Sequence, residues 1–190
     1  MRHFYLITFL LSLCLLQGCP AVVVGGAATG AAVNNDRRTT GAMIDDQGIE
    51  FKASSAIYQN KKIYDQSHIN VTSFNGVVLV TGETPNEALK QEVTNLIKDL
   101  PRVRKVYNEL AILAPSAVPS RTSDSWITSK VKSKLLADKD VKGLNTKVVT
   151  ERGIVYLMGK IRRAEADKVV NVVRGTAGVQ KVVKVFEYID

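Results

Sequence analysis

Side chains that could act as nucleophiles or soft metal ligands are scarce in this chain. Its 190 residues include two cysteines, Cys14 and Cys19, and two histidines, His3 and His68. A zinc site or an activated cysteine needs several such side chains close together. The sequence therefore predicts no catalytic residue, no metal site and no cofactor.

Cys19 is the side chain whose surroundings indicate a reaction. A positive start, Met1-Arg2-His3, precedes the apolar run Phe4–Leu16, and Gly18 stands before the cysteine. These are the parts of a secretory signal peptide, and the apolar run is shorter than the ~20 residues of a membrane span. Leu-x-Gly-Cys also resembles the bacterial lipobox, in which the cysteine sulfur carries a diacylglycerol. We expect residues 1–18 to be a lipoprotein signal peptide and Cys19 the lipid attachment site. The alternative is an ordinary cleaved signal with an incidental cysteine.

Two segments of simple composition divide the remainder of the chain. Residues 20–47 are rich in Ala, Gly and Val and then polar, which indicates a flexible tether. A second membrane segment at 21–33 is less favoured, because it is short and rich in glycine. A linker with two prolines follows at 114–122. The predicted domains are thus 48–113 and 123–190, after a tether that comprises 19–47.

The two predicted domains are copies of one sequence, each of roughly 65 residues. The glycines correspond at a shift of 77 positions and the apolar residues at 76. The corresponding pairs are Gly76 with Gly153, Gly82 with Gly159, Val93 with Val169, Ile97 with Val173, Val103 with Val179 and Val106 with Val182.

Each copy has the pattern of a small α+β domain. Asn75-Gly76 between two β-rich runs predicts a tight hairpin. An amphipathic helix and a final strand, 103–113 in the first copy, follow. A further helix is predicted before each hairpin, at Gly48–Gln59 and Ser123–Leu136. The order α-β-β-α-β predicts a three-stranded mixed sheet with two helices on one face.

The motifs NGVVLVTG and RGIVYLMG, each followed by a helix and a strand such as KVYNEL, resemble BON domains. The resemblance covers nearly all of residues 48–189. With LLQGC in front and SWITSKVKSKLL at the start of the second copy, the whole chain resembles the dual-BON outer-membrane lipoproteins of Gram-negative bacteria. The resemblance implies phospholipid binding and roles in outer-membrane integrity, at cell-division sites and at the outer-membrane protein assembly machinery.

The two copies differ in charge. Residues 48–113 have eight Lys and Arg against seven Asp and Glu, whereas residues 122–190 have fourteen against eight. An exported protein meets an acidic membrane surface rather than nucleic acid. We therefore expect the second domain to bind anionic phospholipid, such as cardiolipin or phosphatidylglycerol, and no nucleic acid.

The first helix of the second copy is the predicted phospholipid-binding site. Its apolar positions Ile127, Val131 and Leu135 share one face and should pack on the sheet. A tryptophan, three lysines and an outward leucine lie on the other faces, and tryptophan favours the headgroup level of a bilayer. The predicted binding residues are Trp126, Lys130, Lys132, Lys134 and Leu136. A partly buried tryptophan with solvent-facing lysines is the competing interpretation.

The sequence thus favours a non-enzymatic lipoprotein anchored in the outer membrane and facing the periplasm. Pro20, in place of an aspartate that would favour inner-membrane retention, agrees with this location. The alternative function is a periplasmic adaptor whose first domain docks on outer-membrane protein assembly machinery.

Overall fold

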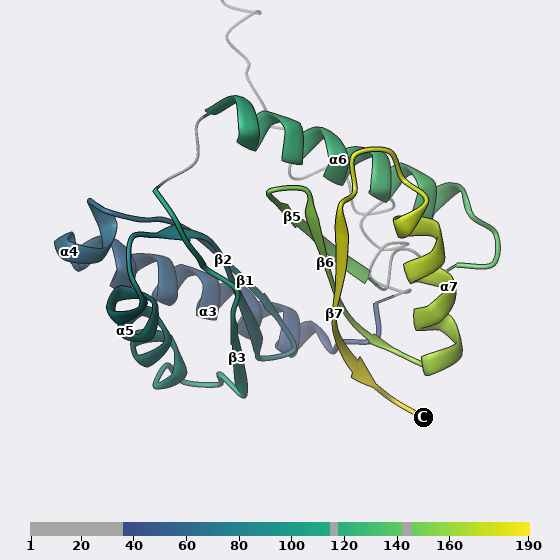
Figure 1. Cartoon of the computed structure of the whole chain (residues 1–190). Helices are drawn as coiled ribbons and strands as arrows, with labels where there is room; N and C mark the ends of the chain where they lie inside the picture. Colours follow the sequence, from purple (N-terminus) through teal and green to yellow (C-terminus); the bar gives the residue numbers. More distant parts are fainter. Residues whose placement is uncertain (1–35, 115–117, 142–145) are drawn as a thin grey trace, which may run out of the picture. The chain divides into compact units, whose positions relative to one another are not determined.

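The computed structural model describes residues 36–114, 118–141 and 146–190 (Figure 1). The predicted signal peptide, Cys19 and most of the predicted tether lie outside these residues. Residues 36–190 form one compact unit that contains both copies of the repeat.

The first copy has the predicted α-β-β-α-β order with two small additions. β1 pairs antiparallel with β2, and β3 and β4 both pair with β2 in parallel, so the sheet is mixed as predicted. The elements are α3 (Thr40–Gln59), α4 (Lys61–Tyr64), β1 (His68–Phe74), β2 (Val77–Thr84), α5 (Glu87–Lys98), β3 (Lys105–Asn108) and β4 (Ala111–Ile112).

The second copy repeats this arrangement with three strands in the order β5-β6-β7. β5 is antiparallel to β6, and β7 is parallel to it. The elements are α6 (Val118–Ala137), β5 (Thr146–Glu151), β6 (Ile154–Ile161), α7 (Arg163–Arg174) and β7 (Lys181–Tyr188). The predicted fold class, two tandem α+β domains, is confirmed.

In each copy two helices cover one face of the sheet (Figure 1). The first core joins apolar residues of α3 and α5 to Val78 and Val80 of β2. The second core joins α6 and α7 to Val155 and Leu157 of β6. Most of the stability of helices in proteins comes from packing of their apolar faces, so this burial stabilises the four helices.

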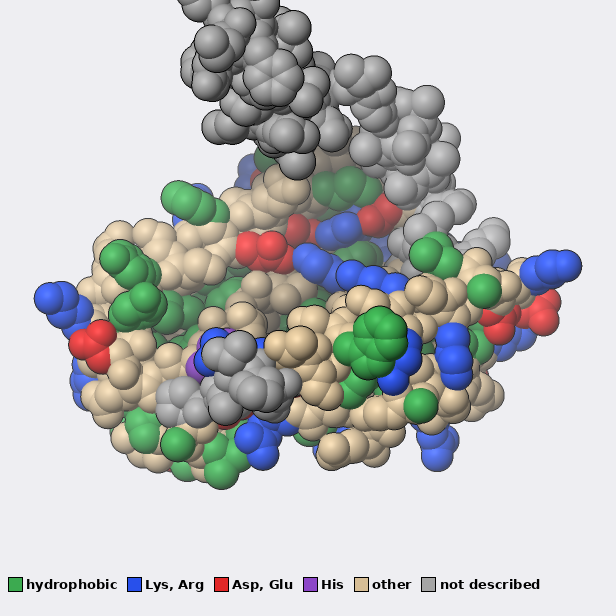
Figure 2. Space-filling view, turned by 90° about the horizontal axis from the view of Figure 1, so that it is seen from above, with side chains coloured by type: hydrophobic (Ala, Val, Ile, Leu, Met, Phe, Trp, Pro, Cys, Tyr) green, Lys and Arg blue, Asp and Glu red, His purple; other side chains and the backbone are tan. Residues whose placement is uncertain are grey.

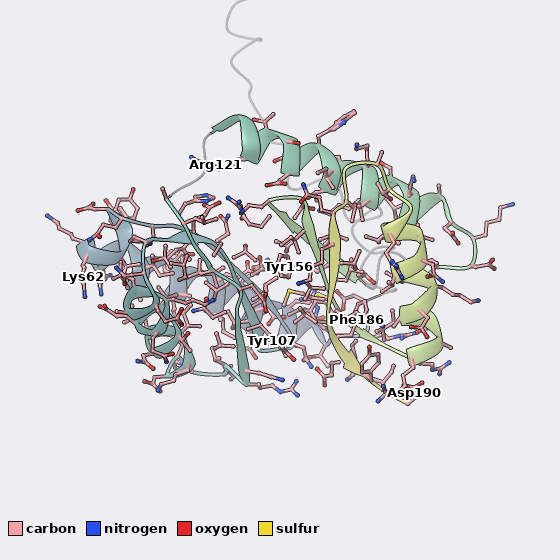
Figure 3. The ribbon with its side chains drawn as sticks, viewed as in Figure 1. Lys62, Tyr107, Arg121, Tyr156, Phe186 and Asp190 are labelled. Carbon is pink, nitrogen blue, oxygen red and sulfur yellow. The ribbon has the colours of Figure 1, made fainter. Side chains whose placement is uncertain are left out.

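A third apolar cluster joins the two copies through the other faces of their sheets. It contains Phe74 and Leu79 from the first copy and Tyr156, Met158 and Val185 from the second; Figure 3 labels Tyr156, and Tyr107 at the edge of the cluster. Because β2 and β6 are covered on both faces, their apolar residues run without alternation.

Each hairpin turns through two residues in the left-handed region, as Asn75-Gly76 predicted. Asn75 and Gly76 have φ of 52° and 74°, and Arg152 and Gly153 have 53° and 72°. Two successive positive φ values define the type I′ turn, whose twist matches that of the strands.

The boundaries differ from the prediction at three places. The predicted tether extended too far: α3 begins at Thr40 rather than Gly48, because the Thr39 hydroxyl caps it and Asp46 is held inside the fold. The helix before the second hairpin begins at Val118 rather than at Ser123, with Pro119 in the first turn where no amide is needed. The last strand of the first copy is broken, because Leu110 turns into the helix-covered core.

Candidate functional site

Helix α6 presents two different faces. Ile127, Val131 and Leu135 are buried against the second sheet, as predicted. On the opposite side, the side chains of Trp126 and Leu136 are 66% and 61% exposed. Two large apolar side chains of one helix are therefore exposed to solvent.

Positive charge lies beside these apolar groups. Lys132 is exposed on the outer side of α6, together with Ser129 and Ser133. Figure 2 views the molecule from above in the orientation of Figure 1, and shows hydrophobic and Lys or Arg side chains close together on this face. An apolar group flanked by cations is the composition of a peripheral membrane contact.

Lys130 and Lys134 have a second role that the sequence did not indicate. The Lys130 Nζ donates to the Ala177 carbonyl at 2.7 Å, and the Lys134 Nζ donates to the Gly175 carbonyl at 2.8 Å. Both carbonyls lie just after the C-terminus of α7, where the helix dipole is negative. The two lysines therefore join α6 to α7, and the Lys130 Nζ also lies 5.7 Å from the Trp126 ring centroid.

All five predicted residues thus lie on α6, but they differ in how free they are to bind. Trp126, Lys132 and Leu136 are exposed to solvent. Lys130 and Lys134 already donate hydrogen bonds within the second domain. Their partners lie in the loop after α7, which no helical spacing could reveal.

A polar hollow of about 250 Å³ lies near the start of α6. His68, one of the two histidines of the chain, lines it. Its walls come from both copies of the repeat: His68, Asn70, Arg121, Asp124, Ser125, Thr128, Thr150 and Glu151. Figure 3 labels Arg121 at the beginning of the helix.

Two buried carboxylates meet His68 at this hollow. The His68 Nδ1 lies 3.1 Å from the Glu83 Oε2, and potential ligand atoms of His68, Glu83 and Glu151 all lie within 4.8 Å of one another. The pKa of Glu151 is raised, mainly by burial and further by the Glu83 charge. The hydrogen bond from Asn70 opposes this rise. Three oxygen and nitrogen donors of this kind could hold a divalent cation.

Glu83 also has cationic partners in the protein. The Arg152 Nη1 lies 3.8 Å from the Glu83 Oε1, and His68 forms a second ion pair when it is protonated. Because these groups come from β1, β2 and the β5–β6 turn, the network links the two copies. It therefore fits a structural ion network between the domains.

No helix in the described ranges is both long and apolar enough to cross a bilayer.

Comparison with known proteins gives a consistent result along the chain. A family model described as "BON domain" matches residues 45–114 and 123–190. The outer membrane lipoprotein DolP of Haemophilus influenzae is 41% identical over 175 residues, 92% of this chain and 91% of that protein. The 21 kDa hemolysin of Actinobacillus pleuropneumoniae is 36% identical over 82% of this chain and 80% of that protein. The osmotically-inducible protein Y of Escherichia coli is 27% identical over 82% and 78%, respectively. With two matched copies and similarity to DolP along nearly its whole length, the chain belongs to the BON-domain family, as a two-domain protein of the DolP type.

Proposed function

We propose that this protein is a lipid-anchored envelope protein that binds anionic phospholipid through the outer face of α6. The observation that carries the proposal is the exposure of Trp126 and Leu136 opposite the buried face of that helix, with the exposed Lys132 about one turn before Leu136. The similarity to an outer membrane lipoprotein supports a role in the cell envelope. Acylation of Cys19 would anchor the chain in the outer membrane, facing the periplasm.

The expected binding energies indicate that this site selects anionic lipid and does not serve as the membrane anchor. Each Lys or Arg near an anionic surface contributes about 1 kcal/mol, and this contribution is screened by salt. Tryptophan and leucine add apolar burial at the level of the headgroups. The diacylglycerol expected on Cys19 carries two acyl chains, which is enough for stable anchoring. A second, charge-dependent contact would instead concentrate the protein where anionic lipid is abundant, for example at division sites.

Replacing Trp126, Lys132 and Leu136 together by alanine should weaken binding to vesicles that contain phosphatidylglycerol or cardiolipin by about tenfold or more. These three are the appropriate targets, because their side chains face solvent and their loss leaves the α6–α7 contacts in place. Flotation with vesicles at low and high salt measures the effect. The unchanged chain should bind best at low salt.

Tyr64→Ala provides a matched control, since it removes an exposed aromatic side chain from α4 in the first domain. It should leave flotation unchanged. The proposal is wrong if the folded triple variant floats like the unchanged chain, or if the unchanged chain binds neutral phosphatidylcholine vesicles equally well.

A further inference from the structure

The outer face of α3 carries a row of exposed apolar side chains that neither domain covers. Ile44, Phe51 and Tyr58 are 65%, 76% and 64% exposed. They recur every seventh residue, opposite the buried Ile49, Ala53 and Ile57, so they form one continuous stripe. Exposed apolar patches of this kind mark interaction surfaces.

A row of small residues runs beside this stripe, also at every seventh position. It consists of Gly41, Gly48 and Ser55. A methyl group at Gly48 would meet nothing within 4 Å, so packing inside the protein does not require glycine there. Glycine in the middle of a helix is unfavourable relative to alanine. Close approach of another helix from outside would explain why the row is small.

The two rows fit each other when α3 meets an antiparallel copy of itself. In one register, Gly48 of each copy faces Phe51 of the second copy, and the outer layers pair Gly41 with Tyr58 and Ser55 with Ile44. Every layer then places a large side chain against a small one, as in knobs-into-holes packing. A parallel pair would place Phe51 against Phe51 and Gly48 against Gly48, which leaves clashes and gaps.

The charges beside the stripe are complementary in the same register. Asp45 and Lys52 lie on one side of it, so the antiparallel pair brings Asp45 of each copy near Lys52 of the other, twice by symmetry. The Asp45 carboxylate accepts from the Arg102 Nη1 at 2.8 Å and retains capacity to accept more. The other side carries the uncharged Gln47 and Ser54. A parallel pair would instead place Asp45 and Lys52 of one copy against the uncharged Gln47 and Ser54 side of the other, so it would gain no such ion pair.

We propose that α3 is the interface of a twofold-symmetric homodimer, formed by antiparallel packing of the two rows. Such an interface is isologous, because the same patch serves both copies. A 20-residue helix is about 30 Å long, so one helix pair makes a small interface and the dimer should depend on concentration.

Cysteine crosslinking of the full chain in cells tests the register. Cells that produce both an Ile44→Cys chain and a Ser55→Cys chain should yield a disulfide-linked dimer under mild oxidation. Ile44→Cys alone should not, because the two copies of that position lie at opposite ends of the antiparallel pair. The unsubstituted chain, with its own Cys14 and Cys19, sets the background. A crosslink from Ile44→Cys alone, or an adduct with a different protein, would overturn the proposal.

Gly48→Leu tests the interface without removing any contact within the protein. Sedimentation should show a dimer for the unchanged chain and a dissociation constant raised about tenfold or more for Gly48→Leu. Gln91→Leu, on the exposed side of α5, should dimerise like the unchanged chain. Equal dimerisation of Gly48→Leu, or a monomer at every concentration of the unchanged chain, contradicts the proposal.

Discussion

Asp46→Ala should lower the free energy of unfolding by about 3–4 kcal/mol, which is the range for the loss of a buried, hydrogen-bonded charge. The Asp46 carboxylate is buried and accepts from the Ser73 hydroxyl at 2.6 Å. It also accepts from the amides of Asn75 and Gly76 at 2.7 and 2.9 Å, and from the Arg38 Nη1 at 2.9 Å. One carboxylate thus holds the first hairpin turn against α3.

Chemical denaturation followed by circular dichroism measures this loss. Asp45→Ala is the matched control. The Asp45 carboxylate is next to Asp46 in the sequence, but it lies at the surface and pairs with the exposed Arg102. Surface ion pairs contribute about 0–1 kcal/mol, so the control should unfold almost like the unchanged chain. If Asp46→Ala and Asp45→Ala had equal effects, the turn would not depend on the buried carboxylate.

The same carboxylate should make stability depend on pH in acid. Burial alone would raise the pKa of Asp46, but the hydrogen bonds from Gly76, Ser73, Asn75 and Arg38 together lower it below 3.8. A lowered pKa in the folded state means that the stabilisation is complete above the unfolded pKa and is lost as the pH falls through the folded one. Below about pH 4, the free energy of unfolding should therefore fall less steeply with decreasing pH for Asp46→Ala than for the unchanged chain.

Asp124 has the corresponding position in the second copy. It accepts from the amides of Arg152 and Gly153, both at 2.8 Å. The sequence repeat could have identified this pair, since each aspartate precedes its hairpin glycine by nearly the same distance. The glycines and apolar residues that define the repeat do not include these aspartates, and aspartates are ordinarily surface residues.

Most of the fold was predictable because the signals are local. The Asn75-Gly76 turn and the spacing of apolar residues in α5 and α7 depend on neighbours in the chain, and the duplication supplies each signal twice. The early start of α3 was not predictable in this way. It depends on the Thr39 cap and on contacts of Asp46 with a hairpin about 30 residues away.

The candidate site likewise has features that follow from local sequence and features that depend on distant contacts. The outward position of Trp126 and Leu136 follows from helical geometry, once Ile127 and its companions are assigned to the core. The contacts of Lys130 and Lys134 with the end of α7, and of His68 with Glu83 and Glu151, join segments distant in sequence. No local pattern encodes such contacts.

Gly82→Ala should destabilise the first domain by at least about 3 kcal/mol, because strain and overlap both oppose the new methyl group. Gly82 lies in β2 opposite Ile69 with φ of 119°, a conformation that an alanine rarely adopts. A Cβ at this position would also overlap the His68 carbonyl oxygen, which belongs to the neighbouring strand. Backbone cannot yield as a flexible side chain would, so β1 must move away from β2.

Thermal unfolding should show this as a fall in melting temperature of roughly 6–12 °C for a unit of this size. Gly175→Ala is the control, because its φ is −78° and a Cβ there would meet only ordinary contacts at 3.7 and 3.8 Å. It should change the melting temperature little. If the melting temperature of the Gly82→Ala chain equalled that of the control, β2 could run alongside His68 without a positive φ at position 82. The hydrogen-bonded register of β1 and β2, and with it the position of Glu83 beside His68, would then not depend on this glycine.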